Sequence, residues 1–93
     1  MDGAQRFNQL TIHYFSWVRE KIGKDSEQVS VPAEVADISG LIDWLVLSGD
    51  ESYAHAFEHR AVVRAAIDRC HVGHKALLDG AREIAFFPPV TGG

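Results

Sequence analysis

The chain has 93 residues, of which 46% are hydrophobic and 24% charged, and this composition predicts one globular domain and excludes a disordered chain. Its net charge of −4 disfavours a nucleic-acid-binding protein. No apolar run approaches the roughly 18 residues that a membrane-spanning helix needs. Cys70 is the only cysteine, which excludes an intramolecular disulfide bond and favours a reducing compartment. Because the first residues also lack the pattern of a signal peptide, we expect a cytoplasmic protein with no nucleic-acid or membrane partner.

The first third of the chain predicts two strands joined by a short helix. Residues 10–15 alternate between apolar and polar side chains, as a half-buried strand does. A second alternating segment covers residues 28–31 and ends at a proline. Between the two strands, Ser16 is expected to cap a short helix over residues 17–22, which Gly23 ends in a left-handed turn.

One long helix and two further strands are predicted in the rest of the chain. Asp37 is a favourable N-cap for a helix over residues 38–48, whose apolar side chains recur at the helical period and form one stripe. Residues 53–60 are expected to form another short helical turn. Residues 62–67 have the pattern of a mostly buried strand, and residues 84–87 that of the last strand.

This order of elements predicts an α+β fold, with one long helix packed on one face of a small mixed sheet. Such a two-layer arrangement buries the apolar stripe of the helix against the apolar face of the sheet. With the last strand inside the sheet, the outline is that of a ubiquitin-like β-grasp. We expect a flexible N-terminus over residues 1–8, the β-grasp domain over 9–87 and an extended diglycine tail over 88–93.

The last residues, Phe-Phe-Pro-Pro-Val-Thr-Gly-Gly, carry the strongest functional signal. The diglycine has no side chain that could pack or cap, and it presents its carboxylate on an unhindered carrier. Pro88 and Pro89 fix φ and favour an extended tail. Phe86 and Phe87 face opposite sides of a strand, so one of them is expected in the core with Ile84. A frayed terminus without function is the simplest alternative for the diglycine.

Three segments together resemble one known family. Residues 86–93 are similar to the C-terminal signature of the small, sulfur-carrying subunit of molybdopterin synthase, and this motif is highly specific. Residues 15–23 match that family's Phe-x-x-Val-Arg-Glu-x-x-Gly segment, and residues 65–68 are similar to its third-strand segment. Two departures are visible. Asp68 stands where the family usually has Asn, and the turn over residues 79–83 is one residue longer than usual.

The resemblance implies a covalent sulfur carrier that acts through Gly93. In that family an adenylyltransferase uses ATP and Mg to convert the C-terminal carboxylate to an acyl adenylate, and sulfur from a donor protein then displaces AMP. The resulting thiocarboxylate donates its sulfur to cyclic pyranopterin monophosphate, and two such transfers form the dithiolene of molybdopterin. The chain would then be no enzyme alone, and it would hold no bound cofactor.

The resemblance also implies the partners and the residues that meet them. The large subunit of molybdopterin synthase receives the tail, in a heterotetramer of two small and two large subunits. The adenylyltransferase and the sulfur donor protein are the other partners. The residues expected to enter the insertion channel are Val90, Thr91 and Gly92, and those expected at the interface outside it are Phe87, Pro88 and Pro89.

Other functions remain open. The chain could be a diglycine carrier of another pathway, such as thiamine or tungsten cofactor synthesis or protein conjugation, or an interaction module whose tail is recognised without modification. No His-Glu-x-x-His motif or cysteine pair accompanies the histidines, so we expect surface or packing roles for them and no metal site. Cys70 is expected as a half-buried strand or strand-end thiol, since no flanking feature marks a nucleophile. The histidine pairs weighed for a metal are His55/His59 and His71/His74.

Overall fold

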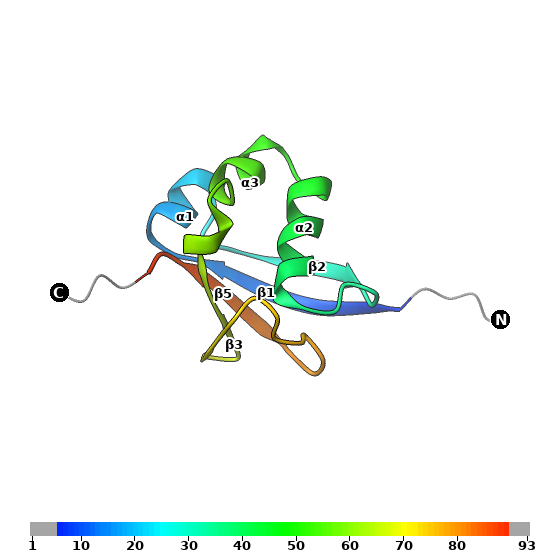
Figure 1. Ribbon diagram of the computed structural model, residues 1–93. Helices are drawn as coiled ribbons and strands as arrows, with labels where there is room; N and C mark the ends of the chain where they lie inside the picture. Colours follow the sequence, from blue (N-terminus) through cyan, green and yellow to red (C-terminus); the bar gives the residue numbers. More distant parts are fainter. Residues whose placement is uncertain (1–5, 90–93) are drawn as a thin grey trace.

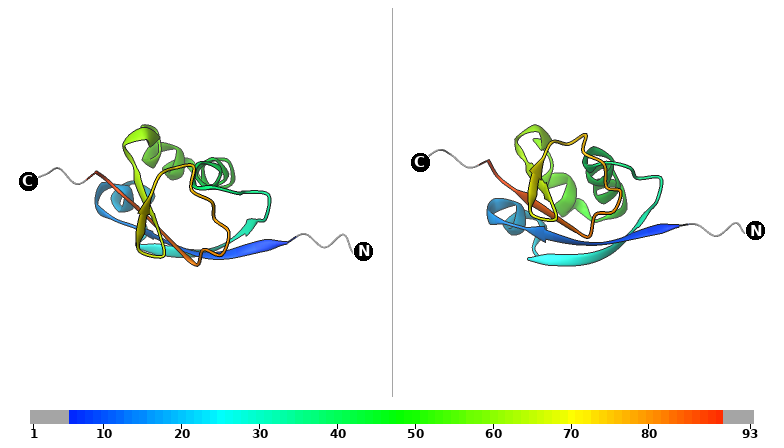
Figure 2. Two further views of the ribbon diagram at one scale, coloured as in Figure 1. Left: turned by 60° about the horizontal axis from the view of Figure 1, so that its bottom comes forward. Right: turned by 90° about the horizontal axis from the view of Figure 1, so that it is seen from below.

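In a computed structural model, which describes residues 6–89, the chain forms a five-stranded sheet with helices on one of its faces (Figure 1). Two further views agree that the three α-helices all lie on the same side of β1 and β2 (Figure 2). The elements in chain order are β1 (Phe7–Tyr14), α1 (Ser16–Ile22), β2 (Ser26–Pro32), α2 (Ile38–Ser48), α3 (Glu51–Ala56), the 3-10 turn η1 (Arg60–Val62), β3 (Arg64–Ile67), β4 (Cys70–Val72) and β5 (Glu83–Phe87).

The sheet has the strand order β2-β1-β5-β3-β4. β1 and β2 are antiparallel, and β5 runs parallel to β1 with Ile12 opposite Ile84. On its other side β5 pairs with β3 in antiparallel fashion, with Ala66 opposite Ala85, and β3 and β4 form a hairpin. The last strand is therefore hydrogen-bonded on both sides at the centre of the sheet. This is the mixed sheet of the predicted β-grasp arrangement.

The core lies between the sheet and the helices. α2 begins after Asp37, whose carboxylate accepts a hydrogen bond from the backbone N–H of Gly40 at 2.7 Å, and both ends of the helix are as predicted. The apolar stripe of α2 forms one cluster with the inward side chains of the strands, and none of them is more than 3% exposed. They are Ile38, Leu41, Ile42 and Leu45 in α2, and Leu10, Ile12, Tyr14, Val31, Ala65, Ile84 and Phe86 in the sheet.

The predicted cap of the short helix α1 is wrong. Phe15 holds the cap position with extended backbone and makes no side-chain cap hydrogen bond, whereas Ser16 is already the first residue of the helix. The backbone N–H of Phe15 donates to the carbonyl of Phe86 at 3.1 Å, so this long-range contact keeps the chain extended up to Phe15. The end of the helix is as predicted. Gly23 has φ 89, and its N–H donates to the carbonyl of Arg19 at 2.7 Å.

All four predicted strands begin at other residues than the sequence predicts, including β2 at Ser26 and β5 at Glu83. β1 begins at Phe7, which pairs with Pro32 in β2, although this part of the chain lacks a clear apolar alternation. Residues 7 and 8, which the sequence predicts to be flexible, are therefore part of the sheet. β3 begins at Arg64, since residues 60–62 form a 3-10 turn before it.

β4 is absent from the prediction. It has three residues and follows a two-residue turn in which Asp68 (φ 48) and Arg69 (φ 74) are both left-handed, the geometry of a tight hairpin. The carboxylate of Asp68 accepts hydrogen bonds from the backbone N–H groups of Arg82 and Glu83 at 3.1 and 2.8 Å. Asp in place of Asn is therefore compatible with this turn. Cys70 is the first residue of β4, which agrees with the expected strand-end position, but it is exposed rather than half-buried.

Local hydrogen bonds set the start of α3 and the turn before β5. α3 begins two residues earlier than predicted, because the Asp50 carboxylate accepts the backbone N–H of Ser52 at 2.9 Å and caps the helix. Before β5, the N–H of Ala81 donates to the carbonyl of Leu78 at 2.8 Å, and Gly80 has φ 77. A glycine is favoured at this left-handed position of a β-turn.

We predict that Phe86→Ala lowers the free energy of unfolding by about 3–5 kcal/mol, because the ring is fully buried and its loss leaves a cavity. Phe87→Ala, at the next position but on the half-buried face, is the matched control, with an expected loss of about 1 kcal/mol. Urea unfolding at neutral pH measures both values. Equal losses would contradict the assignment of Phe86 to the core side of β5.

Candidate functional site at the root of the C-terminal tail

The candidate site is the point where the chain leaves the centre of the sheet. β5 ends at Phe87, and Pro88 and Pro89 follow it outside any strand. This end of the described chain lies on the opposite side of the molecule from the start of β1 (Figure 1). The structure thus shows where the tail begins. The predicted site residues Val90, Thr91, Gly92 and Gly93 lie outside the described residues.

Phe86 anchors the root of the tail in the core. Its ring stacks on that of Tyr14 with the centroids 6.3 Å apart, and it meets the ring of Phe57 edge-on at 5.1 Å. Its carbonyl accepts the backbone N–H of Phe15 at 3.1 Å. Phe86 and Ile84 are both 0% exposed. The prediction that one of the two phenylalanines joins Ile84 in the core is therefore confirmed.

Phe87 lies on the other face of the sheet and is half-buried. Its ring centroid is 5.0 Å from that of His71, and its backbone is paired with that of Arg64 in β3. An open groove of about 550 Å³ begins at this point and continues to the last described residue. The groove, which we call the tail-root groove, is lined by Arg64, Ala65, His71, Val72, Gly73, Phe87 and Pro89.

Two residues of the tail-root groove have no signal in the sequence. Arg64 comes next to Phe87 only through the pairing of β3 with β5, and His71 only through the short strand β4. His71 is noticeable in the sequence only for its spacing from His74, where the sequence does not favour a metal site, and nothing in its neighbourhood indicates a contact with an aromatic ring. Only the order of the strands brings these side chains together.

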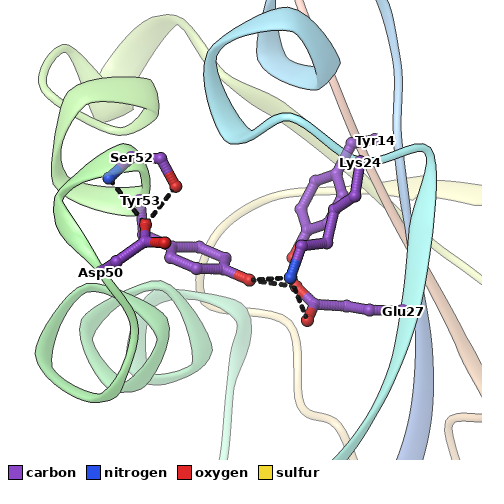
Figure 3. A network of polar contacts seen from close by, with 6 residues as sticks. All are labelled: Tyr14, Lys24, Glu27, Asp50, Ser52 and Tyr53. Atoms are coloured by element: carbon purple, nitrogen blue, oxygen red, sulfur yellow. Dashed lines mark hydrogen bonds and ion pairs between the residues drawn. The ribbon is translucent and has the colours of Figure 1, made fainter.

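A network of polar side chains lies between the sheet and helix α3 (Figure 3). One carboxylate oxygen of Glu27 in β2 accepts the hydroxyl groups of Tyr14 at 2.7 Å and Tyr53 at 2.6 Å. Lys24 donates to the other oxygen at 3.3 Å and to the Tyr53 hydroxyl at 3.1 Å. Tyr14 comes from β1 and Tyr53 from α3. The network therefore ties α3 to the sheet through the residue whose ring stacks on Phe86.

The pKa shifts of the network favour its hydrogen bonds at neutral pH. Burial by itself raises the pKa of Glu27, but the hydrogen bonds from Tyr53, Tyr14 and Lys24 outweigh it and hold that pKa below its ordinary value. Burial, and then the hydrogen bond to Glu27, raises the pKa of Tyr14 and that of Tyr53. Both phenols therefore stay protonated donors, and Glu27 stays an ionised acceptor.

Three of the four histidines weighed for a metal site make separate local contacts. His55 Nδ1 lies 3.9 Å from the carboxylate of Glu58, and His74 Nε2 lies 2.7 Å from the carbonyl oxygen of Val63. His71 packs on the aromatic ring in the tail-root groove. Within residues 6–89, no group of three or more His, Cys, Asp or Glu is arranged to hold a metal ion. None of the described helices has the length and apolarity needed to cross a membrane.

The fold and the position of the tail define a ubiquitin-like β-grasp domain whose central strand leads into a C-terminal tail. Solved structures share this fold. SAMP1 from Haloferax volcanii has a TM-score of 0.66 and 21% identity, over 92% of this chain and 100% of that one. The putative molybdopterin converting factor, subunit 1, from Pyrococcus furiosus has a TM-score of 0.63 and 21% identity, over 88% and 98%. These likenesses confirm the predicted fold.

Sequence comparison then gives the family. The model of the ThiS family matches residues 12–93, and the chain belongs to this family. The chain is 32% identical over 84 residues to the molybdopterin synthase sulfur carrier subunit of Escherichia coli K12, covering 90% of this chain and 99% of that protein. The subunit of the same name from Haemophilus influenzae is 33% identical, with the same coverage. The resemblance to the sulfur-carrying subunits is therefore confirmed.

We predict that Glu27→Gln destabilises the fold by about 1–3 kcal/mol at neutral pH, because an amide cannot replace the charged acceptor of three donors. The pKa of Glu27 is lowered in the folded state. Its stabilisation is therefore fully present above the ordinary glutamate pKa of about 4.3, and it is lost as the pH falls through the lower folded value.

Urea unfolding at a series of pH values checks this prediction. The difference in the free energy of unfolding between the wild type and Glu27→Gln should narrow in acid. Glu20→Gln, at an exposed position of α1, is the control and should change the stability little. A difference that stays constant down to the acid end of the series would contradict an ionised Glu27 at the centre of the network.

Proposed function

We propose that the chain is the sulfur-carrier subunit of a molybdopterin synthase and that the carboxyl group of Gly93 carries the sulfur. The observation that carries the proposal is the match to sulfur carrier subunits over 90% of the chain. The fold supports it, because the central strand β5 leads directly into the motif Phe-Phe-Pro-Pro-Val-Thr-Gly-Gly.

The proposed chemistry begins at the C-terminal carboxylate. A carboxylate is a poor acyl donor until one of its oxygens belongs to a good leaving group, so a separate adenylyltransferase first joins Gly93 to AMP from ATP and releases pyrophosphate. Sulfur at the oxidation level of hydrosulfide, supplied by a donor protein, then attacks the carbonyl carbon and displaces AMP, which leaves the thiocarboxylate and releases a proton. That sulfur attacks cyclic pyranopterin monophosphate. Water cleaves the acyl–sulfur bond and returns Gly93 to its carboxylate form.

The composition of the tail suits insertion into a narrow active site. Gly92 and Gly93 have no Cβ that could obstruct attack on the carbonyl carbon. Pro88 and Pro89 restrict the start of the tail to extended conformations, which reduces the entropy lost on insertion. Residues 90–93 span at most about 13 Å at about 3.3 Å each. Residues 90–93 can therefore enter the active site while Pro88, Pro89 and the folded domain over residues 9–87 remain outside it.

The proposed partners follow from this chemistry. They are the large subunit of molybdopterin synthase, in a heterotetramer with two copies of each subunit, the adenylyltransferase and the sulfur donor protein. We place Phe87, Pro88 and Pro89 at the interface with the large subunit and Val90, Thr91 and Gly92 in its channel. The half-buried Phe87 at the mouth of an open groove supports this placement. The free, exposed Cys70 fits the reducing conditions of the cytoplasm.

A second candidate function is that of a ubiquitin-like modifier. The structural neighbours include the small archaeal modifier protein 1 of Methanosarcina acetivorans, with a TM-score of 0.65 and 18% identity. The same adenylated Gly93 would then be attacked by the amine of a lysine on a target protein, with an isopeptide bond as the product. At this identity the neighbour supports the fold, whereas the sequence matches support sulfur transfer.

Intact mass spectrometry tests the proposed function. The purified chain is measured before and after incubation with ATP, Mg, a sulfide source and a molybdopterin synthase adenylyltransferase. We predict a mass gain equal to the exchange of one oxygen atom for sulfur. Gly93→Val, which keeps the length of the tail but blocks access to the carbonyl carbon, should remain unchanged although its fold is intact. The E. coli sulfur carrier subunit serves as the positive control for the enzyme.

An unchanged mass of the wild type beside a converted positive control would contradict the proposed function. A mass gain that Gly93→Val retains would show that the sulfur is attached elsewhere, and it would also contradict it. A non-covalent interaction module predicts a third result, in which binding of the large subunit survives in Gly93→Val and no chemical change occurs in either protein.

A further inference from the structure

The tail-root groove has a charge that differs from that of the whole chain. Its lining contains Arg64 and His71 but no carboxylate, whereas the chain has a net charge of −4. Arg64 is exposed, and none of the ion pairs formed among residues 6–89 includes it. A guanidinium group without a partner in the described chain therefore stands beside Phe87.

The nearest acidic residues of the two paired strands are occupied elsewhere. Glu83 lies at the opposite end of β5 from Phe87, and its carboxylate is 3.4 Å from His13 Nε2. Asp68 follows the far end of β3, where its carboxylate accepts two backbone N–H groups. Both carboxylates lie several residues along the strands from the groove, and each residue adds about 3.3 Å to that distance. Among residues 6–89, no carboxylate of the paired strands is therefore placed to pair with Arg64.

The position of the groove decides what can cover it. Pro89 is the last described residue and lines the groove. Residues 90–93 reach at most about 13 Å beyond it. A protein that holds Gly93 in its active site therefore has the mouth of its channel within this distance of Pro89, and its surface lies against Arg64 and Phe87.

We infer that the tail-root groove docks an acidic rim of the large subunit. Arg64 donates hydrogen bonds to a carboxylate at the mouth of the channel that receives the tail, a geometry that the planar guanidinium group suits. The ring pair of Phe87 and His71 forms the apolar floor on which the partner packs. This inference rests on the proposed function, because it takes the large subunit as the partner.

The ion pair acts on the rate and the selectivity of association. An exposed pair at the rim of an interface changes affinity by roughly two- to fivefold, whereas two like charges face to face weaken binding further. Salt screens both effects, with a Debye length of about 10 Å at 0.1 M and about 3 Å at 1 M. A groove that docks an acidic rim therefore predicts a salt-dependent loss of binding when the charge of Arg64 is removed or reversed.

Binding of the full-length chain to a molybdopterin synthase large subunit tests the inference. The variants are Arg64→Gln, Arg64→Glu and the matched control Arg6→Glu. Arg6 is also exposed and directly precedes β1, which starts on the opposite side of the molecule from the end of β5 (Figure 1). Its substitution changes the net charge equally. Dissociation constants and association rates are measured at about 0.05 M and 0.5 M salt. Mass conversion by the adenylyltransferase is recorded for each protein, and urea unfolding shows that each one is folded.

At low salt we expect Arg64→Gln to bind about threefold more weakly and Arg64→Glu about tenfold or more, mainly through slower association. Arg6→Glu should stay within about twofold of the wild type, and high salt should remove most of the differences. If Arg64→Glu behaves as Arg6→Glu does, the docking inference is overturned while the proposed function stands. The inference is also overturned if the Arg64 variants bind the large subunit normally and are impaired only in mass conversion by the adenylyltransferase. A wild-type chain that neither partner binds contradicts the proposed function and, with it, the inference.

Discussion

β5 is hydrogen-bonded to β1 on one side and to β3 on the other, and the proposed function depends on this constraint. A strand held along both edges cannot detach without opening the sheet, so the residues that follow it start from a fixed point. The rings of Tyr14 and Phe57 hold the side chain of Phe86, and the network around Glu27 joins Tyr14 to α3. Core packing and backbone pairing together therefore set the position from which a tail is presented.

Side chains alternate between the two faces of β5, so the residues that stabilise the core differ from those available for recognition. Phe86 points into the core, whereas its neighbour Phe87 points to the open face and packs on His71. A change on the open face can therefore alter binding while the fold is preserved. The same face places Arg64 beside the tail in a chain whose overall charge is negative. A small carrier that must meet several proteins in turn can use such local charge to select among them.

Much of the fold could be predicted because the periodic pattern of apolar residues that marks a buried face can be recognised from the local sequence alone. The stripe over residues 38–48, the alternation in β1 and β2 and the apolar run of β5 predict these elements without knowledge of the rest of the chain. The predicted cap at Ser16 is wrong because a distant carbonyl in β5 extends the preceding strand. β4 is too short for its residues to show the two-residue alternation of a strand. The tail motif identifies the family, but Arg64 and His71 join the site only through strand pairing, which no local pattern reveals.

The most direct test of the central claim is a single transfer of sulfur to a pterin. The thiocarboxylated chain is mixed with a molybdopterin synthase large subunit and cyclic pyranopterin monophosphate, without any other sulfur source. The intact mass of the chain and the pterin product are then measured in parallel. A sulfur carrier of this pathway returns to its carboxylate mass as molybdopterin forms. A thiocarboxylate that persists beside a large subunit shown to be active with the E. coli carrier, or a lysine adduct in place of the pterin product, would contradict the claim.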